Sequence, residues 1–355
     1  MRKITIKEMI DFYDNSLRKT VKNKEKLTRF EMHKSEYLRY VVDVLNGDER
    51  LIHHYNIFII FEPKPRLIMS LNMTDKIVNH YFTTKYLIPI LDKKLDDRNV
   101  ATRIGKGTDY ALKLVKKYIE YYKRNKLDCY ILKIDISKFF YTIDHNILKH
   151  MLKEDLPHDE YLFCCKIIES TNYDYINDKI NRILEKYPNI TLPFYEYGKG
   201  LPIGNLSSQC LSVYYLNRLD HYIIHNLHLK NYVRYMDDFL IFCEDKEYLK
   251  KCEDIILEKI VNEYKLKINQ KKTFISNMRY GVTFLGYKFF VKNNRTMMII
   301  KKSSITSMRK KIKRTINYYN HGLITFEKYF SSMTNYYFSY RCNRIKIKGI
   351  IDYYL

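Results

Sequence analysis

The sequence predicts an α+β fold in which two acid-bearing strands lie in a sheet surrounded by helices. One strand is YVRYMDDFLIFCED at 232–245, an apolar run that Asp237 and Asp238 interrupt. The other is CYILKIDISKFF, a strand by composition, in which Asp135 stands between two isoleucines. Helical patterns separate these strands along a chain of 355 residues, which is long enough for two or three subdomains. An unpaired buried charge costs several kcal/mol in practice, so the three acids need a physical explanation.

The composition favours a polyanionic partner. Lys and Arg total 63 against 40 Asp and Glu, a net charge of +23, while 46% of the residues are hydrophobic, as in a globular protein. A surplus of this size is typical of nucleic-acid binding first and of binding to an anionic membrane surface second. The many Lys, Ile, Asn and Tyr residues are also what an AT-rich genome would encode, so codon drift is an alternative source of part of the basicity.

In the first half of the chain, the expected helices alternate with a single β-like run. Apolar residues at helical spacing predict helices over 5–46 and 70–97. Residues 51–61 have strand composition and end at the turn signal EPKPR. The Gly-containing stretch ATRIGKGTDYA precedes another predicted helix that ends near residue 126.

The second half repeats this alternation. After the strand with Asp135, Asp144 is the predicted N-cap of a helix over HNILKHML. A loop rich in Pro and Gly is predicted at 187–205, and a second strand region lies around MRYGVTFLGYKFFV. From residue 291 the tail has fourteen Lys and Arg but two acids, and it follows helical patterns rich in Tyr. The remaining predicted helices are 158–186, 207–228 and 246–264.

Targeting, disulfide and metal signals are weak in this sequence. We expect no signal peptide, no membrane span and no membrane partner, because charges break every apolar stretch. Seven cysteines, an odd number without CxxC spacing, indicate reduced core thiols and a cytoplasmic protein. His221, His225 and His228 share a helical spacing, but without a nearby acidic or cysteine ligand an exposed helix face is favoured over a metal site.

Carboxylates from two strands that converge repel one another unless positive charge lies between them. Two Mg²⁺ ions can supply that charge, because Mg²⁺ prefers carboxylate oxygens and substrate phosphates as ligands. A tight turn would place Asp237 and Asp238 at the tip of a hairpin beside Asp135. The alternative is a polar turn with Asp135 paired to a lysine. Because both stretches carry acids within apolar strands, we favour a metal site.

The motifs resemble those of one known family. IDISKFF, LPIGNLSSQ, YMDDF, KINQKKTFIS and FLGYKFF occur in the order and at the spacing of the palm motifs of reverse transcriptases. KPRLIMSLNMTDKIVNHYF and ATRIGKGTDYA are similar to the finger motifs of that family. The resemblance covers roughly residues 60–290.

This resemblance implies a right-hand polymerase that copies RNA into DNA with two Mg²⁺ ions. The expected subdomains are fingers with an N-terminal helical extension at 1–130, a palm with an antiparallel sheet at 131–290, and a small basic helical thumb at 291–355. A segment at about 155–195 within the palm would contribute to the fingers. The implied partners are a template RNA, a primer or cDNA strand and deoxynucleotide substrates.

The motif LPIGNLSSQ refines the resemblance. It is similar to the version found in reverse transcriptases of bacterial diversity-generating retroelements, which belong to a group II intron-like lineage. Ile203 and Gln209 stand where most reverse transcriptases have Gln and Pro. An apolar residue cannot hydrogen-bond to a nucleotide, so error-prone copying is implied, notably at template adenines. A small basic accessory protein is implied as well. The alternatives are a defence-associated (antiviral) reverse transcriptase or an intron-like relative in which Ile203 only fills the core.

Further roles follow from matching positions. Asp135, Asp237 and Asp238 would hold the metals, together with the backbone carbonyl of Ile136. Phe140, five residues after Asp135, matches the steric gate that excludes ribonucleotides.

The nucleotide-binding set and the proton donor follow in the same way. Lys272 would protonate the leaving pyrophosphate, with Lys271 as its adjacent rival. Arg66 and Arg103 are candidates for holding the triphosphate, because a guanidinium matches phosphate oxygens; Lys106 competes with them. The remaining nucleotide-binding positions are Lys138, Phe139, Ile203, Gly204 and Gln209.

Four other functions are disfavoured. GKGT at 105–108 is not a P-loop, because Gly107 rather than Ser or Thr follows Lys106. An RNA-dependent RNA polymerase is disfavoured by Phe140. A non-catalytic RNA-binding protein would have no need for three intact aspartates. The tail has too few acids for a nuclease metal site.

Overall fold

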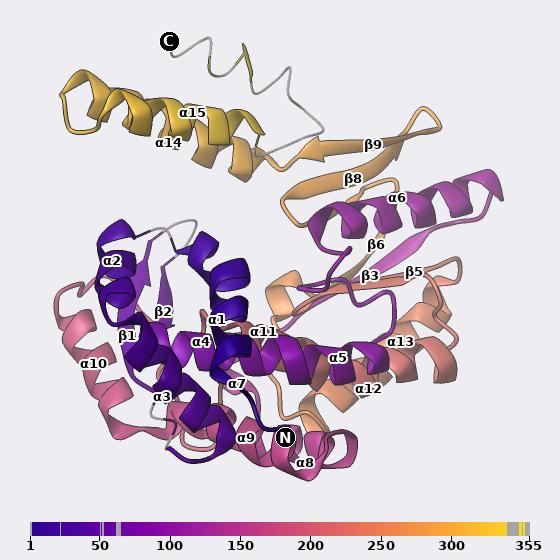
Figure 1. Ribbon diagram of the computed structural model, residues 1–355. Helices are drawn as coiled ribbons and strands as arrows, with labels where there is room; N and C mark the ends of the chain where they lie inside the picture. The colour runs from indigo at the N-terminus through magenta and orange to yellow at the C-terminus, as the bar shows by residue number, and fades with distance from the viewer. Residues whose placement is uncertain are drawn as a thin grey trace.

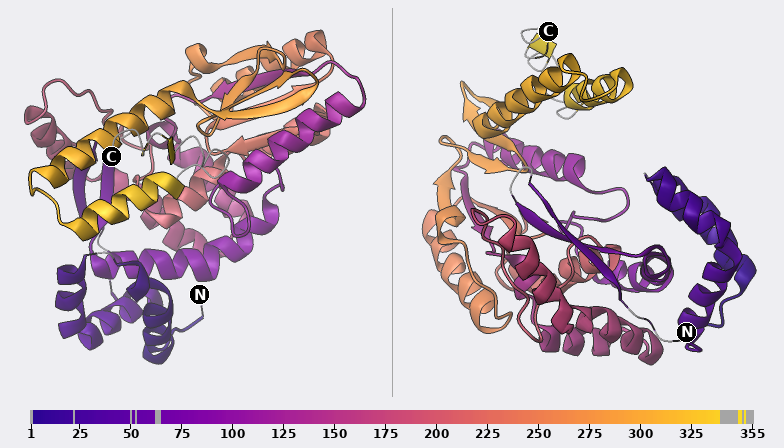
Figure 2. Two further views of the ribbon diagram at one scale, coloured as in Figure 1. Left: turned by 90° about the horizontal axis from the view of Figure 1, so that it is seen from above. Right: turned by 90° about the vertical axis from the view of Figure 1, so that its left-hand side faces the viewer.

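The structure is a computed structural model that describes residues 2–21, 23–49, 51, 53–61, 65–338, 348, 349 and 351. The first part of the predicted EPKPR turn, Cys342 and most of the chain after 338 therefore lie outside the described residues. In the right-hand view of Figure 2, the N-terminal helices and the helices α14 (Lys302–Asn320) and α15 (Phe326–Phe338) stand at opposite ends of a C-shaped arrangement, with the sheets between them.

The N-terminal region is helical but not continuous. The sequence predicted one helical stretch over 5–46. In the structure a π turn and a 3₁₀ turn separate α1 (Ile6–Phe12) from α2 (Lys24–Met32), and His33 separates α2 from α3 (Lys34–Asn46). α3 packs on α4 (Met73–Phe82), α2 packs on α3, and Phe12 of α1 meets Tyr81 of α4 edge-on at a ring distance of 4.9 Å.

A two-stranded sheet follows these helices. β1 (Tyr55–Ile60) confirms the predicted β-like run, but β2 (Arg66–Leu71) was not anticipated, because its apolar residues continue directly into the helix of α4. The strands are antiparallel, and their inner face packs on α10 (Asp174–Glu185).

The central sheet has four antiparallel strands in the order β4–β5–β3–β6. Their bounds are β3 (Tyr130–Asp135), β4 (Tyr232–Tyr235), β5 (Asp238–Cys243) and β6 (Phe274–Asn277). Ile131, Leu132 and Ile134 on β3 are all fully buried, because helices cover both faces of the strand. This explains why β3 reads as a continuous apolar run rather than an alternating one.

Helices and short turns surround this sheet (Figure 1). Asp144 is the N-cap of α8, as predicted, and its carboxylate accepts hydrogen bonds from the backbone N–H groups of Asn146 and Ile147. The remaining bounds are η1 (Tyr13–Leu17), η2 (Arg18–Thr20), η3 (Thr83–Leu87), α5 (Ile88–Leu91), η4 (Asp92–Lys94), α6 (Thr108–Arg124), α7 (Phe139–Thr142), α8 (His145–Asp155), α9 (His158–Ile168), η5 (Glu169–Asn172), α11 (Leu206–Tyr215), α12 (Asn217–His221), η6 (Tyr222–Asn226), α13 (Lys246–Asn262) and η7 (Gln270–Lys272).

The basic tail is not wholly helical. β7 (Val282–Phe284), β8 (Tyr287–Lys292) and β9 (Arg295–Ile300) form a third antiparallel sheet. β9 lies in the segment where a helical thumb was predicted to begin, so that part of the secondary-structure prediction was wrong. Thr296 and neighbouring β-forming residues alternate in and out along β9, a period-two pattern that the high density of charge concealed.

Helices α14 (Lys302–Asn320) and α15 (Phe326–Phe338) form an antiparallel pair that stands apart from the other helices in Figure 1. Tyr319 and Tyr329 stack at 4.5 Å where the pair turns.

Two of the weaker sequence signals can be compared with the structure. The six cysteines within the described residues are free; Cys129, Cys164 and Cys252 are buried in the core, whereas Cys165, Cys210 and Cys243 are half-buried. None of the helices in the described part of the chain has the length and apolar character needed to cross a membrane.

Candidate active site

Strand pairing brings the three aspartates together. Asp135 ends β3 and lies directly opposite Asp238, the first residue of β5. Asp237 lies in the turn before β5, and its carbonyl accepts a hydrogen bond of 3.3 Å from the backbone N–H of Ile136. Residues about a hundred positions apart in the chain thus form one carboxylate cluster at the end of the central sheet.

The turn that carries Asp237 has an unusual backbone. Met236 has φ +57°, a left-handed conformation that side chains other than those of Gly, Asn and Asp rarely adopt. Such conformations persist where surrounding contacts impose them, and they concentrate at functional sites. The Met236 carbonyl accepts a 3.0 Å hydrogen bond from the buried guanidinium of Arg234.

Two lysines lie on this cluster. The Lys272 amine is 2.7 Å from Asp135 Oδ2, and the Asn269 amide donates to Asp135 Oδ1 at 2.8 Å. The Lys133 amine is 2.9 Å from Asp238 Oδ1 and donates to the Thr283 carbonyl at 2.6 Å. Lys272 is half exposed and can move, whereas the side chain of Lys133 is only 7% exposed.

Burial and mutual repulsion perturb two of the carboxyl groups. Burial is the main cause that raises the pKa of Asp238 to about 6; the Lys133 charge opposes this rise, and the neighbouring aspartates add to it. Burial also raises the pKa of Asp237, again with a contribution from Asp135, while Lys272 and Arg66 act in the opposite direction. The cluster therefore has a surplus of negative charge that a cation would relieve.

The carboxylate cluster meets part of what a pair of Mg²⁺ ions requires. The donor set consists of oxygens, as Mg²⁺ requires. Within the described residues, no group of three His, Cys, Asp or Glu side chains has a metal-binding arrangement. The carboxylates of Asp135 and Asp238 are each paired with a lysine amine. Asp135 can replace its ion pair with the half-exposed Lys272 by a bound cation. In the described part of the chain, Asp237 forms no ion pair with a lysine. Asp238 is tied to the buried Lys133 and fits a neighbouring role better.

The chain is similar to one protein family. Residues 62–289 match the family described as "Reverse transcriptase (RNA-dependent DNA polymerase)". The chain belongs to this family. The match confirms the predicted fold class, an α+β polymerase domain with antiparallel sheets, and it agrees with the resemblance found in the sequence. The finer assignment to a retroelement lineage and the boundaries between fingers, palm and thumb stay predictions.

Solved structures give a distant likeness of fold. Apo telomerase of Candida tropicalis truncated from the C-terminal domain is 17% identical with a TM-score of 0.47, and the alignment covers 77% of this chain and 60% of that one. The untruncated apo form is 17% identical with a TM-score of 0.46, and the alignment covers 80% of this chain and 51% of that one. Telomerase of Candida albicans in complex with the TWJ fragment of telomeric RNA is 16% identical with a TM-score of 0.44. The alignment covers 81% of this chain and 55% of that one. This reverse transcriptase family member thus spans between half and three-fifths of these telomerase chains. No curated protein sequence matches it.

The segment after β3 lies beside the aspartates. Lys138 has φ +51° and begins the short helix α7, in which Phe139 is buried and Phe140 is half-buried. The two rings meet edge-on at 5.9 Å. The Phe140 carbonyl accepts a 2.7 Å hydrogen bond from the N–H of Leu201, so this segment is fixed against the motif that contains Ile203.

The predicted nucleotide-binding motif packs on β2. The N–H of Met69 donates to the Ile203 carbonyl at 2.8 Å. Gly204 has φ +127°, and a Cβ there would lie 3.1 Å from the Met69 carbonyl, so only glycine fits this approach without strain. Gln209 is half-buried on α11.

The three basic finger candidates differ sharply. Arg66 is exposed and close enough to Asp237 to influence the pKa of that carboxyl. Arg103 is instead bound within its own loop, where it donates to Asp92 Oδ1 at 2.6 Å and to three backbone carbonyls. Lys106 pairs with Asp97 at 2.6 Å. Arg103 therefore has a structural role, and Arg66 is the stronger candidate for a phosphate contact.

Sequence reasoning missed four residues that support the cluster: Lys133, Asn269, Asp220 and Arg234. Lys133 and Arg234 are each the single cation within an apolar strand. A buried charge in a strand identifies a candidate site residue in the same way as Asp135, Asp237 and Asp238 do. Asn269 belongs to the motif KINQKKTFIS, in which only the lysines had suggested a chemical role.

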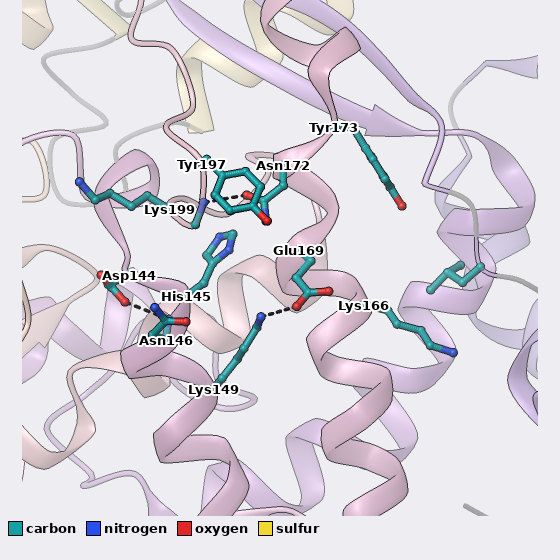
Figure 3. A pocket seen from close by; sticks show the side chains of 12 residues that line it. Asp144, His145, Asn146, Lys149, Lys166, Glu169, Asn172, Tyr173, Tyr197 and Lys199 are labelled. Carbon is teal, nitrogen blue, oxygen red and sulfur yellow. Dashed lines mark hydrogen bonds and ion pairs between the residues drawn. The ribbon is translucent and has the colours of Figure 1, made fainter.

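A separate cavity of about 600 Å³ lies between α8, α9 and the loop at 197–199 (Figure 3). The Lys149–Glu169 ion pair crosses one side of it, and His145 lies at its inner end, donating from Nε2 to the Gly200 carbonyl at 2.7 Å. None of the three aspartates lines this cavity.

Proposed function

We propose that this chain is an RNA-directed DNA polymerase, which adds deoxynucleotides to a primer 3′-hydroxyl on an RNA template. The observation that supports this most is the strand register that sets Asp135 opposite Asp238, with Asp237 in the adjoining turn, inside a chain of the reverse transcriptase family. The net charge of +23 fits a groove for an RNA–DNA duplex.

Asp135, Asp237 and the Ile136 carbonyl would hold two Mg²⁺ ions, with Asp238 beside them. When bound, such a pair supplies activation of the attacking hydroxyl and stabilisation of the leaving oxygen. The remaining contribution of the chain is positioning and charge, as in phosphoryl transfer generally.

Other residues position the substrate in this proposal. The ring of Phe140 lies beneath the sugar and excludes a 2′-hydroxyl. Arg66 and the backbone at Lys138 and Phe139 hold the triphosphate. Lys272 holds a proton at Nζ beside Asp135, within reach of a leaving pyrophosphate; its rival Lys271 is exposed and has no hydrogen-bond or ion-pair partner within the described residues.

The subtype we propose is the error-prone enzyme of a diversity-generating retroelement, with a structured template RNA and a small basic accessory protein as partners. Its support is the motif LPIGNLSSQ with Ile203, a half-buried apolar residue without a hydrogen-bonding group, at the position where most reverse transcriptases have Gln. The alternative is a defence-associated reverse transcriptase, which would use the same catalytic residues. A cytoplasmic location stays a prediction.

Primer extension with purified protein on a defined RNA tests the activity. We expect Asp237→Ala to abolish incorporation and to leave RNA binding unchanged, because it removes a cation ligand but no packing. Glu263→Ala is the matched control, since Glu263 is an exposed acid in a surface pair with Lys259. Polymerisation by the Asp237 variant would refute the mechanism.

Sequencing the cDNA from the same reaction tests the subtype separately. Errors concentrated at template adenines support it, and errors spread evenly over the four template bases would refute it while leaving the polymerase assignment intact.

A further inference from the structure

The strand that leads into the catalytic turn carries a fully buried ion pair. Arg234 on β4 and Asp220 on α12 are both 0% exposed. Arg234 donates from Nε to Asp220 Oδ1 at 2.7 Å and from Nη2 to Oδ2 at 2.5 Å. The Tyr232 hydroxyl and the Asn99 amide also donate to Asp220, at 2.5 and 3.2 Å.

Stability alone does not account for this arrangement. Burying two charges is costly, and replacing such pairs with apolar residues is often neutral or stabilising. A buried pair of this kind can instead fix one conformation of the neighbouring backbone. Here the guanidinium has donors left over after it binds Asp220.

Those remaining donors reach the catalytic turn. Arg234 Nη1 donates to the carbonyl of Met236 at 3.0 Å, at the residue with φ +57° that precedes Asp237. On the other side of the turn, the Asp237 carbonyl is bound by the N–H of Ile136. The backbone that presents the Asp237 carboxylate is thus held from both sides, and one of the two contacts is the arginine.

The same side chain ties the turn to two other elements. Arg234 Nη2 donates to the Val213 carbonyl on α11, the helix that carries Gln209, at 2.9 Å. The Arg234 backbone exchanges hydrogen bonds of 3.0 Å with Arg98 and Val100, in the segment that leads to the predicted finger motif. One residue therefore connects the catalytic turn, the helix of the nucleotide-binding motif and a finger loop.

We propose that Arg234 is a positioning residue, which acts through the Met236 carbonyl to set the turn geometry of Asp237 and depends on Asp220 to hold its charge. This inference rests on the proposed polymerase function and deepens it. A planar guanidinium is required, because a lysine can pair with Asp220 but cannot direct donors to the Val213 and Met236 carbonyls as well.

The test compares Arg234→Lys with Arg218→Lys in the full chain. Arg218 lies on the same helix as Asp220 and forms an exposed pair with Glu154 at 2.5 Å, so it controls for the substitution itself. The measurements are the melting temperature, the affinity for an RNA–DNA primer–template, single-turnover incorporation, and amide hydrogen exchange of the peptide that contains 235–238.

For Arg234→Lys we expect faster exchange at 235–238 and incorporation reduced at saturating nucleotide by at least about tenfold, because small misplacement of a reacting group is costly. The KM for nucleotide and the duplex affinity should change by less than about threefold, since an interaction that acts only in the transition state lowers kcat. Arg218→Lys should match the wild type in all four measurements.

The outcomes separate three explanations. Unchanged exchange and unchanged incorporation in Arg234→Lys would overturn the inference, because the side chain would then only fill the core. Equal losses in kcat and duplex affinity at an unchanged melting temperature would overturn it as well, since the side chain would then act on duplex binding rather than on the catalytic turn. If the wild type itself does not polymerise, the proposed function fails, while the exchange measurement still decides whether Arg234 orders the turn.

A second variant covers the case in which Arg234→Lys does not fold. The double variant Asp220→Asn, Arg234→Met removes both charges, and the asparagine keeps an acceptor for the Tyr232 hydroxyl. It leaves no unpaired buried charge, so it should fold. Faster exchange at 235–238 with reduced incorporation supports the inference, and wild-type behaviour in both refutes it.

Discussion

Lys133 is the buried cation that joins the carboxylate cluster to the three-stranded sheet. Its amine lies 2.9 Å from Asp238 Oδ1 and donates to the Thr283 carbonyl on β7 at 2.6 Å. Replacing Lys133 with methionine conserves most of the volume and removes only the charge and its hydrogen bonds. The stability of this variant therefore measures how far the Lys133 charge offsets the burial of Asp238 and its repulsion from the other aspartates.

The magnitude follows from the pKa of Asp238, which is about 6. Without Lys133 the pKa rises further, but at pH 7 protonation limits the added penalty to about 1.4 kcal/mol, the free energy of one pH unit. The unpaired Thr283 carbonyl adds about 1–3 kcal/mol. Methionine carries no charge, so the variant avoids the desolvation cost of burying the lysine ammonium, and this offsets part of the loss. We therefore expect Lys133→Met to lower the free energy of unfolding by about 2–3 kcal/mol at pH 7.

The pH dependence distinguishes the carboxyl contribution from simple packing loss. Because the pKa of Asp238 is raised above its unfolded value, protonation favours the fold as the pH falls through 6. At pH 5.5 Asp238 is largely protonated in both proteins, so the loss should shrink by about 1 kcal/mol.

Urea unfolding without divalent cations measures this, followed by far-UV circular dichroism since the chain has no tryptophan. Arg29→Met, in an exposed pair with Glu25, is the control and should change stability by less than about 0.5 kcal/mol. An equal loss at pH 7 and 5.5 would refute the electrostatic reasoning, and a loss below that of the control would show that the Lys133–Asp238 pair does not form in solution.

Three further predictions test other parts of the structure. Phe140→Val should raise incorporation of ribonucleotides relative to deoxynucleotides by at least about tenfold in primer extension, because it makes room for a 2′-hydroxyl; unchanged selectivity would exclude Phe140 as the gate. Asp75 is 2% exposed, and burial raises its pKa to about 6, so ionisation costs the fold on the order of 3 kcal/mol at pH 7. Asp75→Asn should accordingly raise the melting temperature at pH 7 and flatten its dependence between pH 4 and 6; a lower melting temperature at pH 7 would contradict this. Gly204→Ala should lose more than about 1 kcal/mol in urea unfolding, because the methyl group meets the Met69 carbonyl at a positive φ; a neutral result would indicate that β2 moves freely.

Much of the central sheet could be predicted from sequence, because its signals are local. Asp135 within an isoleucine-rich strand, and Asp237 with Asp238 between two apolar halves of a hairpin, identify both strands and the turn without any knowledge of their partners. The N-cap of α8 at Asp144 was predictable for the same reason, since a cap and its helix are adjacent in the chain.

The predictions that failed concern short strands in hairpins and one basic loop residue. β2 and β9 are the second strands of hairpins with β1 and β8. The apolar residues of β2 run into those of α4, and the charges around β9 conceal its alternation, so both segments resemble the ends of helices. The burial of Arg103 in its loop is likewise set by Asp92, eleven residues away. A surface cation and a structural one have the same sequence signature, so a basic residue near a motif cannot be assigned to a phosphate from its position alone.

The buried pair of Arg234 and Asp220 has a consequence for how this chain can change over time. Losing either partner alone leaves an unpaired charge in the interior and lowers the stability of the fold. Replacing both residues together avoids that loss. Among descendants of this protein, the two sites should therefore be inherited together, and a lineage that has lost one should have lost the other and found a different way to shape its catalytic turn.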